Sequence, residues 1–417
     1  MINTKSHNEL LPHLFRQEYA KMTAVLCRHF GLRHMEVAED VASDTFLKAS
    51  ESWAVNGVPE NPTAWLYTAA KNKARDYLRR NAIFETKIRE TLRPSESEAG
   101  PDIDFSRQYI ADSQLAMIFA VCNPVNAPES QISLALQILC GFSVEEIANA
   151  FLTKKETVKK RLMRARANLR GDHFQLAPLS EAAIRSRLDA VLATLYLLFN
   201  EGYFSKTNDL VVRKEVCSEA VRLTLVLTEN ELTDTPQVNA LLALMCYQSS
   251  RLEARVNDKG EAILFDEQDK GLWDESLVAR GNYYLVNACG GNAVSRYHLE
   301  AGIAYWHTTP TGENKWPHIL QLYNQLILVA YSPVTALNRA FAYAKVYGCE
   351  AALPEVEKLD LAHHSQYHAL MGYLLATVAP AKAVCHYEQA IRLTNSQSEK
   401  RTLKRELGRL KAKAAQT

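Results

Sequence analysis

Apolar residues recur at helical spacing along almost the whole chain of 417 residues, and glycine is sparse. Residues that return at i, i+3, i+4 and i+7 place one apolar stripe on a helix. Stretches rich in Pro, Gly and polar residues interrupt this pattern, most clearly at residues 93–113 and 171–180. We therefore predict an all-α protein that is divided into separate helical domains.

The interruptions predict four parts. A helical domain spans residues 8–92, an acidic linker spans 93–128, a second small helical domain spans 129–173, and a larger helical region spans 178–417. Within the last part, residues 336–359 and 368–393 each pair two short helices, about one tetratricopeptide period of roughly 34 residues apart. This similarity favours a tetratricopeptide-like region, and an irregular helical bundle is the alternative.

The segment "TKKETVKKRLMRARANLR", residues 153–170, carries eight Lys or Arg side chains and one acid. Val158, Leu162, Ala165 and Leu169 form its apolar stripe. The preceding segment has the capping-box pair Ser143 and Glu146, and we expect Thr153 and Glu156 to repeat that box. Two capped helices that meet near Leu152, where many such turns have glycine, predict a helix-turn-helix.

A helix with one buried stripe and a cationic remainder can enter the major groove of DNA. We predict that base edges are read by Lys159, Lys160 and Met163. Phosphates are assigned to four arginines: Arg161, Arg164, Arg166 and Arg170. The alternative is a solvated basic helix with no ligand.

Two segments of opposite charge precede this unit. In residues 36–50, Asp40 and Asp44 stand one helical turn apart and could dock on a basic partner helix. In residues 61–81, Asn72 and Asp76 offer hydrogen bonds to base edges amid basic side chains, which would suit melted DNA. Each segment, taken alone, could equally be an ordinary solvated surface.

Composition and motifs exclude several classes of protein. The N-terminus lacks the apolar run of a signal peptide, and no stretch is apolar and long enough to span a bilayer. We therefore expect a cytoplasmic protein with no membrane partner. The eight cysteines are scattered without a C-x-x-C pair, and we find no phosphate loop, nucleophile motif or metal-ligand cluster. We expect no cofactor, no metal and no enzymatic activity.

The order of the motifs, from "VAEDVASDTFLKA" through "NPTAWLYTAAKNKARDYLRR" to "LALQILCGFSVEEIANAFLTKKETVKKRLMRARANL", resembles an extracytoplasmic-function (ECF) sigma factor of bacterial RNA polymerase over residues 10–172. The resemblance implies two partners, core RNA polymerase and promoter DNA. It implies polymerase docking by Asp40, Asp44 and Phe46. It implies recognition of the minus-ten element by Asn72, Arg75, Asp76, Arg79 and Arg80, and of the minus-thirty-five element by the helix-turn-helix.

The C-terminal region resembles the subgroup with a tetratricopeptide-like extension, which is regulatory in that subgroup and could have a peptide or protein partner. Seven polar or aromatic residues there either line a pocket or act as caps and core groups: Asn200, Glu201, Tyr203, Asp266, Gln268, Asp269 and Trp273. Two other functions stay open. One is a helix-turn-helix regulator with a helical sensor domain that does not bind polymerase, and the other is a peptide-binding scaffold.

Overall fold

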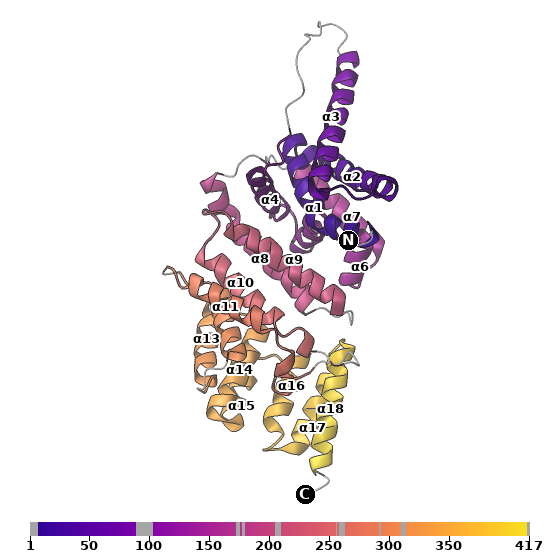
Figure 1. Cartoon of the computed structure of the whole chain (residues 1–417). Coiled ribbons are helices and arrows are strands. Elements are labelled where there is room, and N and C mark those ends of the chain that lie inside the picture. Colours follow the sequence, from indigo (N-terminus) through magenta and orange to yellow (C-terminus); the bar gives the residue numbers. More distant parts are fainter. Residues whose placement is uncertain are drawn as a thin grey trace. The chain divides into compact units, whose positions relative to one another are not determined.

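The computed structural model describes residues 7–88, 103–171, 176, 180–204, 210–255, 257, 263–291, 293–309 and 314–414. Within these ranges the regular structure is helical and contains no strand (Figure 1). The predicted all-α class is therefore confirmed. The chain forms two compact units: unit 1 comprises residues 1–198 and 222–233, and unit 2 comprises residues 199–221 and 234–417.

Unit 1 is built on its first helix, which packs against the next three α-helices. The elements of its N-terminal part are α1 (His7–Phe30), the 3₁₀ turn η1 (Leu32–His34), α2 (Met35–Asn56), α3 (Pro62–Ile88) and α4 (Arg107–Val121). They are followed by α5 (Pro128–Leu134), the π-helical turn η2 (Ala135–Leu139), α6 (Val144–Ala150) and α7 (Lys155–Gly171). Burial of apolar faces such as that of Met22, Val25 and Leu26 holds the bundle together.

The predicted acidic linker is wrong over much of its length, because residues 107–121 form α4. Ser106 caps this helix by accepting a hydrogen bond from the Tyr109 backbone N–H at 3.3 Å. Every side chain from Leu115 to Val121 is buried, and α4 packs on α1. The prediction gave weight to the acidic residues at the start of the segment and not to the continuous apolar run of residues 115–121. Residues 89–102 of the predicted linker lie outside the described residues.

In unit 2, helices that are neighbours in sequence pack against one another. After α10 (Pro236–Ser249) come three 3₁₀ turns, η3 (Glu253–Arg255), η4 (Phe265–Glu267) and η5 (Lys270–Leu272). The later helices are α11 (Glu275–Ala288), α12 (Arg296–Thr308), α13 (Trp316–Val329), α14 (Pro333–Tyr347), α15 (Cys349–Glu357), α16 (Ser365–Leu375), α17 (Pro380–Leu393) and α18 (Gln397–Ala414).

Helices α10 and α11 approach closely at Gly281. A Cβ atom at this position would lie 2.6 Å from Cε1 of Tyr247, whose ring is fully buried. The Tyr247 hydroxyl donates to Oδ1 of the adjacent Asn282 at 2.8 Å. Only a residue without a side chain therefore lets the tyrosine ring lie flat on α11.

The boundary between the units differs from the predicted start of the C-terminal region at residue 178. Helices α8 (Glu181–Tyr203) and α9 (Leu210–Thr228) each contribute residues to both units. Inside unit 1, the Thr194 hydroxyl donates to the Gln131 side chain, and the Arg222 guanidinium donates to the Leu139 carbonyl oxygen at 2.7 Å. The first compact unit thus extends well beyond the helix-turn-helix. Across the described helices, none combines the length and apolar character that crossing a membrane requires.

Candidate polymerase and nucleic-acid interface

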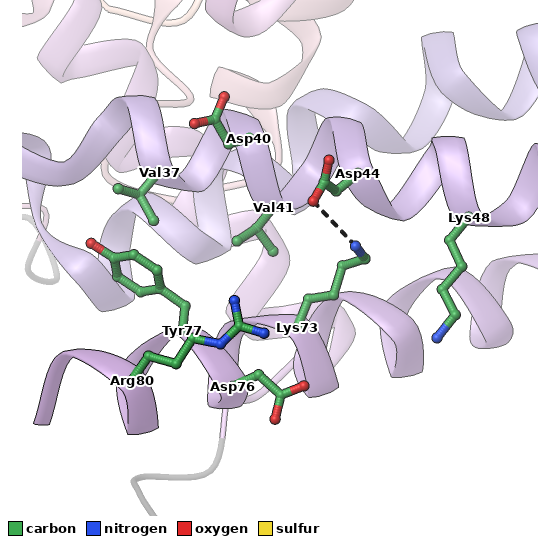
Figure 2. A pocket seen from close by; sticks show the side chains of 9 residues that line it. All are labelled: Val37, Asp40, Val41, Asp44, Lys48, Lys73, Asp76, Tyr77 and Arg80. Carbon is green, nitrogen blue, oxygen red and sulfur yellow. Dashed lines mark hydrogen bonds and ion pairs between the residues drawn. The ribbon is translucent and has the colours of Figure 1, made fainter. Parts of the chain in front are cut away.

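A polar pocket of about 440 Å³ lies between α2 and α3 in unit 1. Figure 2 shows side chains from both helices that point toward each other, among them Val41 and Asp44 of α2 and Lys73 of α3. Asp40 of α2 also lines the pocket, and its carboxylate points away from α3. The remaining lining residues of the pocket are Val37, Lys48, Asp76, Tyr77 and Arg80. The pocket therefore joins the segment predicted to dock on polymerase with the segment predicted to bind the minus-ten element.

The two walls of the pocket differ in charge. Asp40 and Asp44 are exposed on α2, and Asp44 pairs across the pocket with Nζ of Lys73 at 3.2 Å. On α3, Asp76 pairs with Arg79 at 3.2 Å along the exposed face of the helix. Both pairs are exposed, so they are weak and can be exchanged for contacts with a partner.

The start of α3 is fixed by the chain before it. The side chain of Asn61 accepts a hydrogen bond from the Ala64 backbone N–H at 3.0 Å, and Pro62 occupies the first helical turn. Trp53 of α2 meets Trp65 of α3 edge to face, with 5.5 Å between ring centres. These contacts set where Asn72, exposed one helical turn before Asp76, stands relative to α2.

The structure contradicts the docking role of Phe46. This side chain is only 5% exposed and packs against Phe15 and Tyr19 of α1, with ring centres 5.0 and 6.4 Å away. Helical steps of four and three residues put Phe46 on the same face as the buried Ala42 and Ala49. Phe46 therefore belongs to the core of unit 1.

The helix-turn-helix is present as α6 and α7. Ser143 and Glu146 form the predicted capping box at α6, with both hydrogen bonds in place at 3.2 and 2.7 Å. Leu152 in the turn has a φ of 49°, in the left-handed region that glycine adopts more easily. The predicted box at Thr153 is wrong, because α7 starts at Lys155 and its first backbone bonds go to the Lys154 carbonyl oxygen.

The apolar stripe of α7 is confirmed: Val158, Leu162, Ala165 and Leu169 are all buried. On the other faces of the helix, Lys159, Lys160 and Met163 are exposed, Met163 by 63%. Lys159 makes an exposed pair with Glu156 at 3.0 Å. The structure thus places the three residues predicted to read bases where a partner can reach them.

Arg166 of α7 does not lie on the exposed face. Its guanidinium donates two hydrogen bonds to the Glu39 carboxylate of α2, at 2.6 and 2.7 Å, and a third to Oε1 of Gln137 at 2.9 Å. The two charged side chains are only 11% and 14% exposed. Burial alone would lower the pKa of Arg166, but the hydrogen bonds and charge of Glu39 outweigh it and raise the pKa.

A second pair extends this contact, because Arg170, one turn after Arg166 on α7, donates to Glu36, one turn before Glu39 on α2, at 2.8 Å. We call the two pairs, Glu39 with Arg166 and Glu36 with Arg170, the α2–α7 clasp. In this conformation the clasp contradicts the predicted phosphate role of Arg166. Glu36 and Glu39 lie in the acidic segment of residues 36–50, but which arginines they pair with depends on tertiary packing.

The remaining predicted DNA-contacting arginines are distributed over both helices. Arg75, Arg79 and Arg80 are exposed on α3. On α7, Arg164 is exposed, and Arg161 is half-buried with its Nη1 3.5 Å from the Ser133 hydroxyl. The predictions missed Tyr77 and Val37, apolar residues of the pocket that only the approach of α2 to α3 brings together.

Comparison with known proteins defines the class to which this bundle belongs. Residues 14–83, which cover most of α1 to α3 and the whole pocket lining, match the family described as Sigma-70 region 2. Residues 187–289 match a family of unknown function, DUF6596. The N-terminal part of the chain therefore matches sigma-70 region 2, and a second matched region further along the chain has no assigned role.

The chain belongs to the same family as an uncharacterized protein, R00370, of Rhizobium meliloti (strain 1021). The two are 32% identical over 399 residues, 94% of this chain and 93% of that protein. A shorter protein, RNA polymerase sigma factor YlaC of Bacillus subtilis (strain 168), is 27% identical over 165 residues, 39% of this chain and 92% of YlaC. No solved structure matches the chain.

Proposed function

We propose that the protein is an ECF-type sigma factor that binds core RNA polymerase and directs it to promoters. The observation that carries the proposal is the pocket between α2 and α3, within the Sigma-70 region 2 match. Exposed carboxylates and cations line this one pocket. The α2 wall, with Asp40 and Asp44, suits a basic element of polymerase, and the α3 wall, with its cations, suits nucleic acid.

In this proposal Asp40 and Asp44 bind the polymerase. Asn72, Asp76 and the arginines of α3 contact the minus-ten element, and Lys159, Lys160 and Met163 of α7 read the minus-thirty-five element. Base reading by exposed side chains near the N-terminal half of α7 agrees with the docking geometry of helix-turn-helix units. The protein would act in the cytoplasm and without a cofactor.

The helices of unit 2 would form a tetratricopeptide-like extension that modulates this activity, with a peptide or protein as its partner. Consecutive helices of unit 2 pack on one another, which supports such an arrangement. Close helix packing at Gly281 and Gly372, where an added Cβ would meet a tyrosine ring at 2.6 and 3.0 Å, supports it further.

The decisive experiment combines the full-length protein with core RNA polymerase and a genomic promoter library. We expect promoter-dependent transcripts from the wild type. Asp40→Arg should abolish polymerase binding in a fluorescence assay, because it places a cation where a carboxylate meets a basic partner. Asp189→Arg, the same charge reversal at an exposed position on α8, is the matched control and should bind normally.

Lys160→Ala should retain polymerase binding and shift the set of promoters that are used. Duplex DNA binding with no transcripts from any promoter would instead indicate a helix-turn-helix regulator that works without core polymerase. Loss of polymerase binding by both Asp40→Arg and Asp189→Arg would show that the effect is not specific to the pocket.

A further inference from the structure

Unit 2 contains a run of aromatic rings that joins elements far apart in sequence. Each ring contacts the next with centres 4.7 to 5.9 Å apart. In spatial order the run consists of Trp273, Phe265, His307, Trp316, Phe341 and Tyr373. Phe265 is the first residue of η4 and Trp273 directly follows η5. The other four rings come from α12, α13, α14 and α16.

Three cations lie over these rings. Cζ of Arg251 is 4.4 Å from the centre of the Phe265 ring. Nζ of Lys315 is 4.7 Å from the same centre and 5.4 Å from that of Trp316. Nζ of Lys345 is 5.5 Å from the centre of the Trp316 ring. Two lysines therefore approach one tryptophan, although their positive charges repel.

Carboxylates compensate little of this charge. Lys345 pairs with Asp266 at 3.7 Å. Arg251 donates Nε and Nη2 to the neutral side-chain oxygen of Gln268, at 3.2 and 3.1 Å. Lys315 has no ion pair among the described residues.

Burial and charge repulsion act on Lys315 and Arg251. Burial alone would lower the pKa of Lys345 too, but Tyr373 and Asp266 outweigh it and raise that pKa. Burial lowers the pKa of Lys315, and Lys270, Arg251 and Lys345 lower it further against the attraction of Asp266. Burial likewise lowers the pKa of Arg251. Partly buried cations without matching anions are costly unless another group neutralises them.

Two polar atoms inside the aromatic run also lack partners. Nε1 of Trp273 and Nδ1 of His307 are buried, and neither has a hydrogen bond within the described structure. Tryptophan Nε1 is a donor only, so it requires an acceptor. Unsatisfied buried groups beside uncompensated charge are typical of functional sites and are rare in packed cores.

We propose that Lys315 and Lys345, which both approach Trp316, bind a small oxyanion, a carboxylate or phosphate group, and that the nearby charge of Arg251 adds to the attraction for this anion. The lysine ammonium groups donate charge-assisted hydrogen bonds to the anion, which removes their mutual repulsion. Asp266 competes for Lys345 and gives way to the ligand. The site gives the DUF6596 region, residues 187–289, and the helices after it a shared chemical function, the recognition of an anionic metabolite.

The experiment is isothermal titration of the full-length protein with inorganic phosphate and, separately, with citrate, at constant ionic strength set by sodium chloride. Trp316 supplies a second readout through tryptophan fluorescence. We expect saturable binding of one of the two probes, which identifies the class of oxyanion. Because the readout is binding alone, the result does not depend on whether the protein binds polymerase.

Lys315→Gln should weaken that binding by roughly tenfold or more, as expected for loss of one charge-assisted contact. The matched control is Lys358→Gln, at a 71% exposed lysine that directly follows α15, and it should leave binding unchanged. Absence of saturable binding by either probe would overturn the proposal, as would equal binding by wild type and Lys315→Gln. Lys345→Gln tests the second contact independently and should also weaken binding.

Discussion

The α2–α7 clasp yields a quantitative prediction, since its two ion pairs differ mainly in burial. Glu39 and Arg166 are 14% and 11% exposed, whereas Glu36 and Arg170 are 60% and 42% exposed. Removing one partner of a buried pair costs about 3–5 kcal/mol, because it leaves an uncompensated charge. Removing a partner of an exposed pair costs about 0–1 kcal/mol.

We therefore expect Glu39→Gln to lower the free energy of unfolding of unit 1 by about 2–4 kcal/mol. The value lies slightly below the range for a buried pair because the new amide still accepts one hydrogen bond and Gln137 keeps its contact with Arg166. Glu36→Gln, the matched control, should cost less than about 1 kcal/mol. The measurement is urea denaturation followed by circular dichroism.

A double-mutant cycle with Glu39→Gln and Arg166→Met completes the test. The two changes should be strongly non-additive, because the second removes the charge that the first left unpaired. Equal costs of Glu39→Gln and Glu36→Gln, or additive costs in the cycle, would refute the assignment of the clasp as a buried ion pair.

Three further predictions concern other parts of the molecule. Gly281→Ala should destabilise unit 2 by about 1–3 kcal/mol in urea denaturation, because the new methyl group overlaps Tyr247. The control Gly408→Ala, at a position on α18 with no neighbouring atoms, should be neutral or slightly stabilising. Leu152→Asn should raise thermal stability by up to about 1 kcal/mol, because asparagine tolerates the left-handed φ of 49° better and the leucine is exposed. Burial, followed by nearby lysine and arginine charges, lowers the pKa of His307 to about 3. The unfolded chain binds more protons between that pKa and about 6.5, so stability should fall by up to about 1.4 kcal/mol per pH unit as pH drops through this window. His307→Phe should flatten that slope in denaturation curves measured at several pH values, and an unchanged slope would contradict the assignment.

Local sequence signals predicted the helix-turn-helix well. The capping box of Ser143 and Glu146 and the buried stripe of α7 depend on residues close in sequence, and both are present in the structure. The docking role of Phe46 rests on the resemblance alone, whereas its helical spacing from Ala42 and Ala49 indicates the core. Composition likewise led to a linker being predicted in place of α4, because acidic and polar residues precede the apolar run of this helix.

The partners of Arg166 could not be predicted from the same signals. An arginine on a basic helix has the same local pattern whether it faces DNA or a carboxylate 127 residues away. The approach of α2 to α7 decides between them, and that approach depends on the packing of the whole bundle. The pocket between α2 and α3 was predictable only as two separate segments, for the same reason.

The way in which α8 and α9 share their residues between the two units bears on how such a protein can change in evolution. A chain cut directly after the helix-turn-helix would lose Thr194 and Arg222, and with them hydrogen bonds to Gln131 and Leu139 inside unit 1. We therefore expect that recombination at the end of α7 cannot add or remove the residues after it without disturbing unit 1. No single crossover point separates the two units, because residues 199–221 belong to unit 2 and residues 222–233 belong to unit 1. Exchange between relatives should therefore preserve both units only when residues 181–233 are inherited together with each of them.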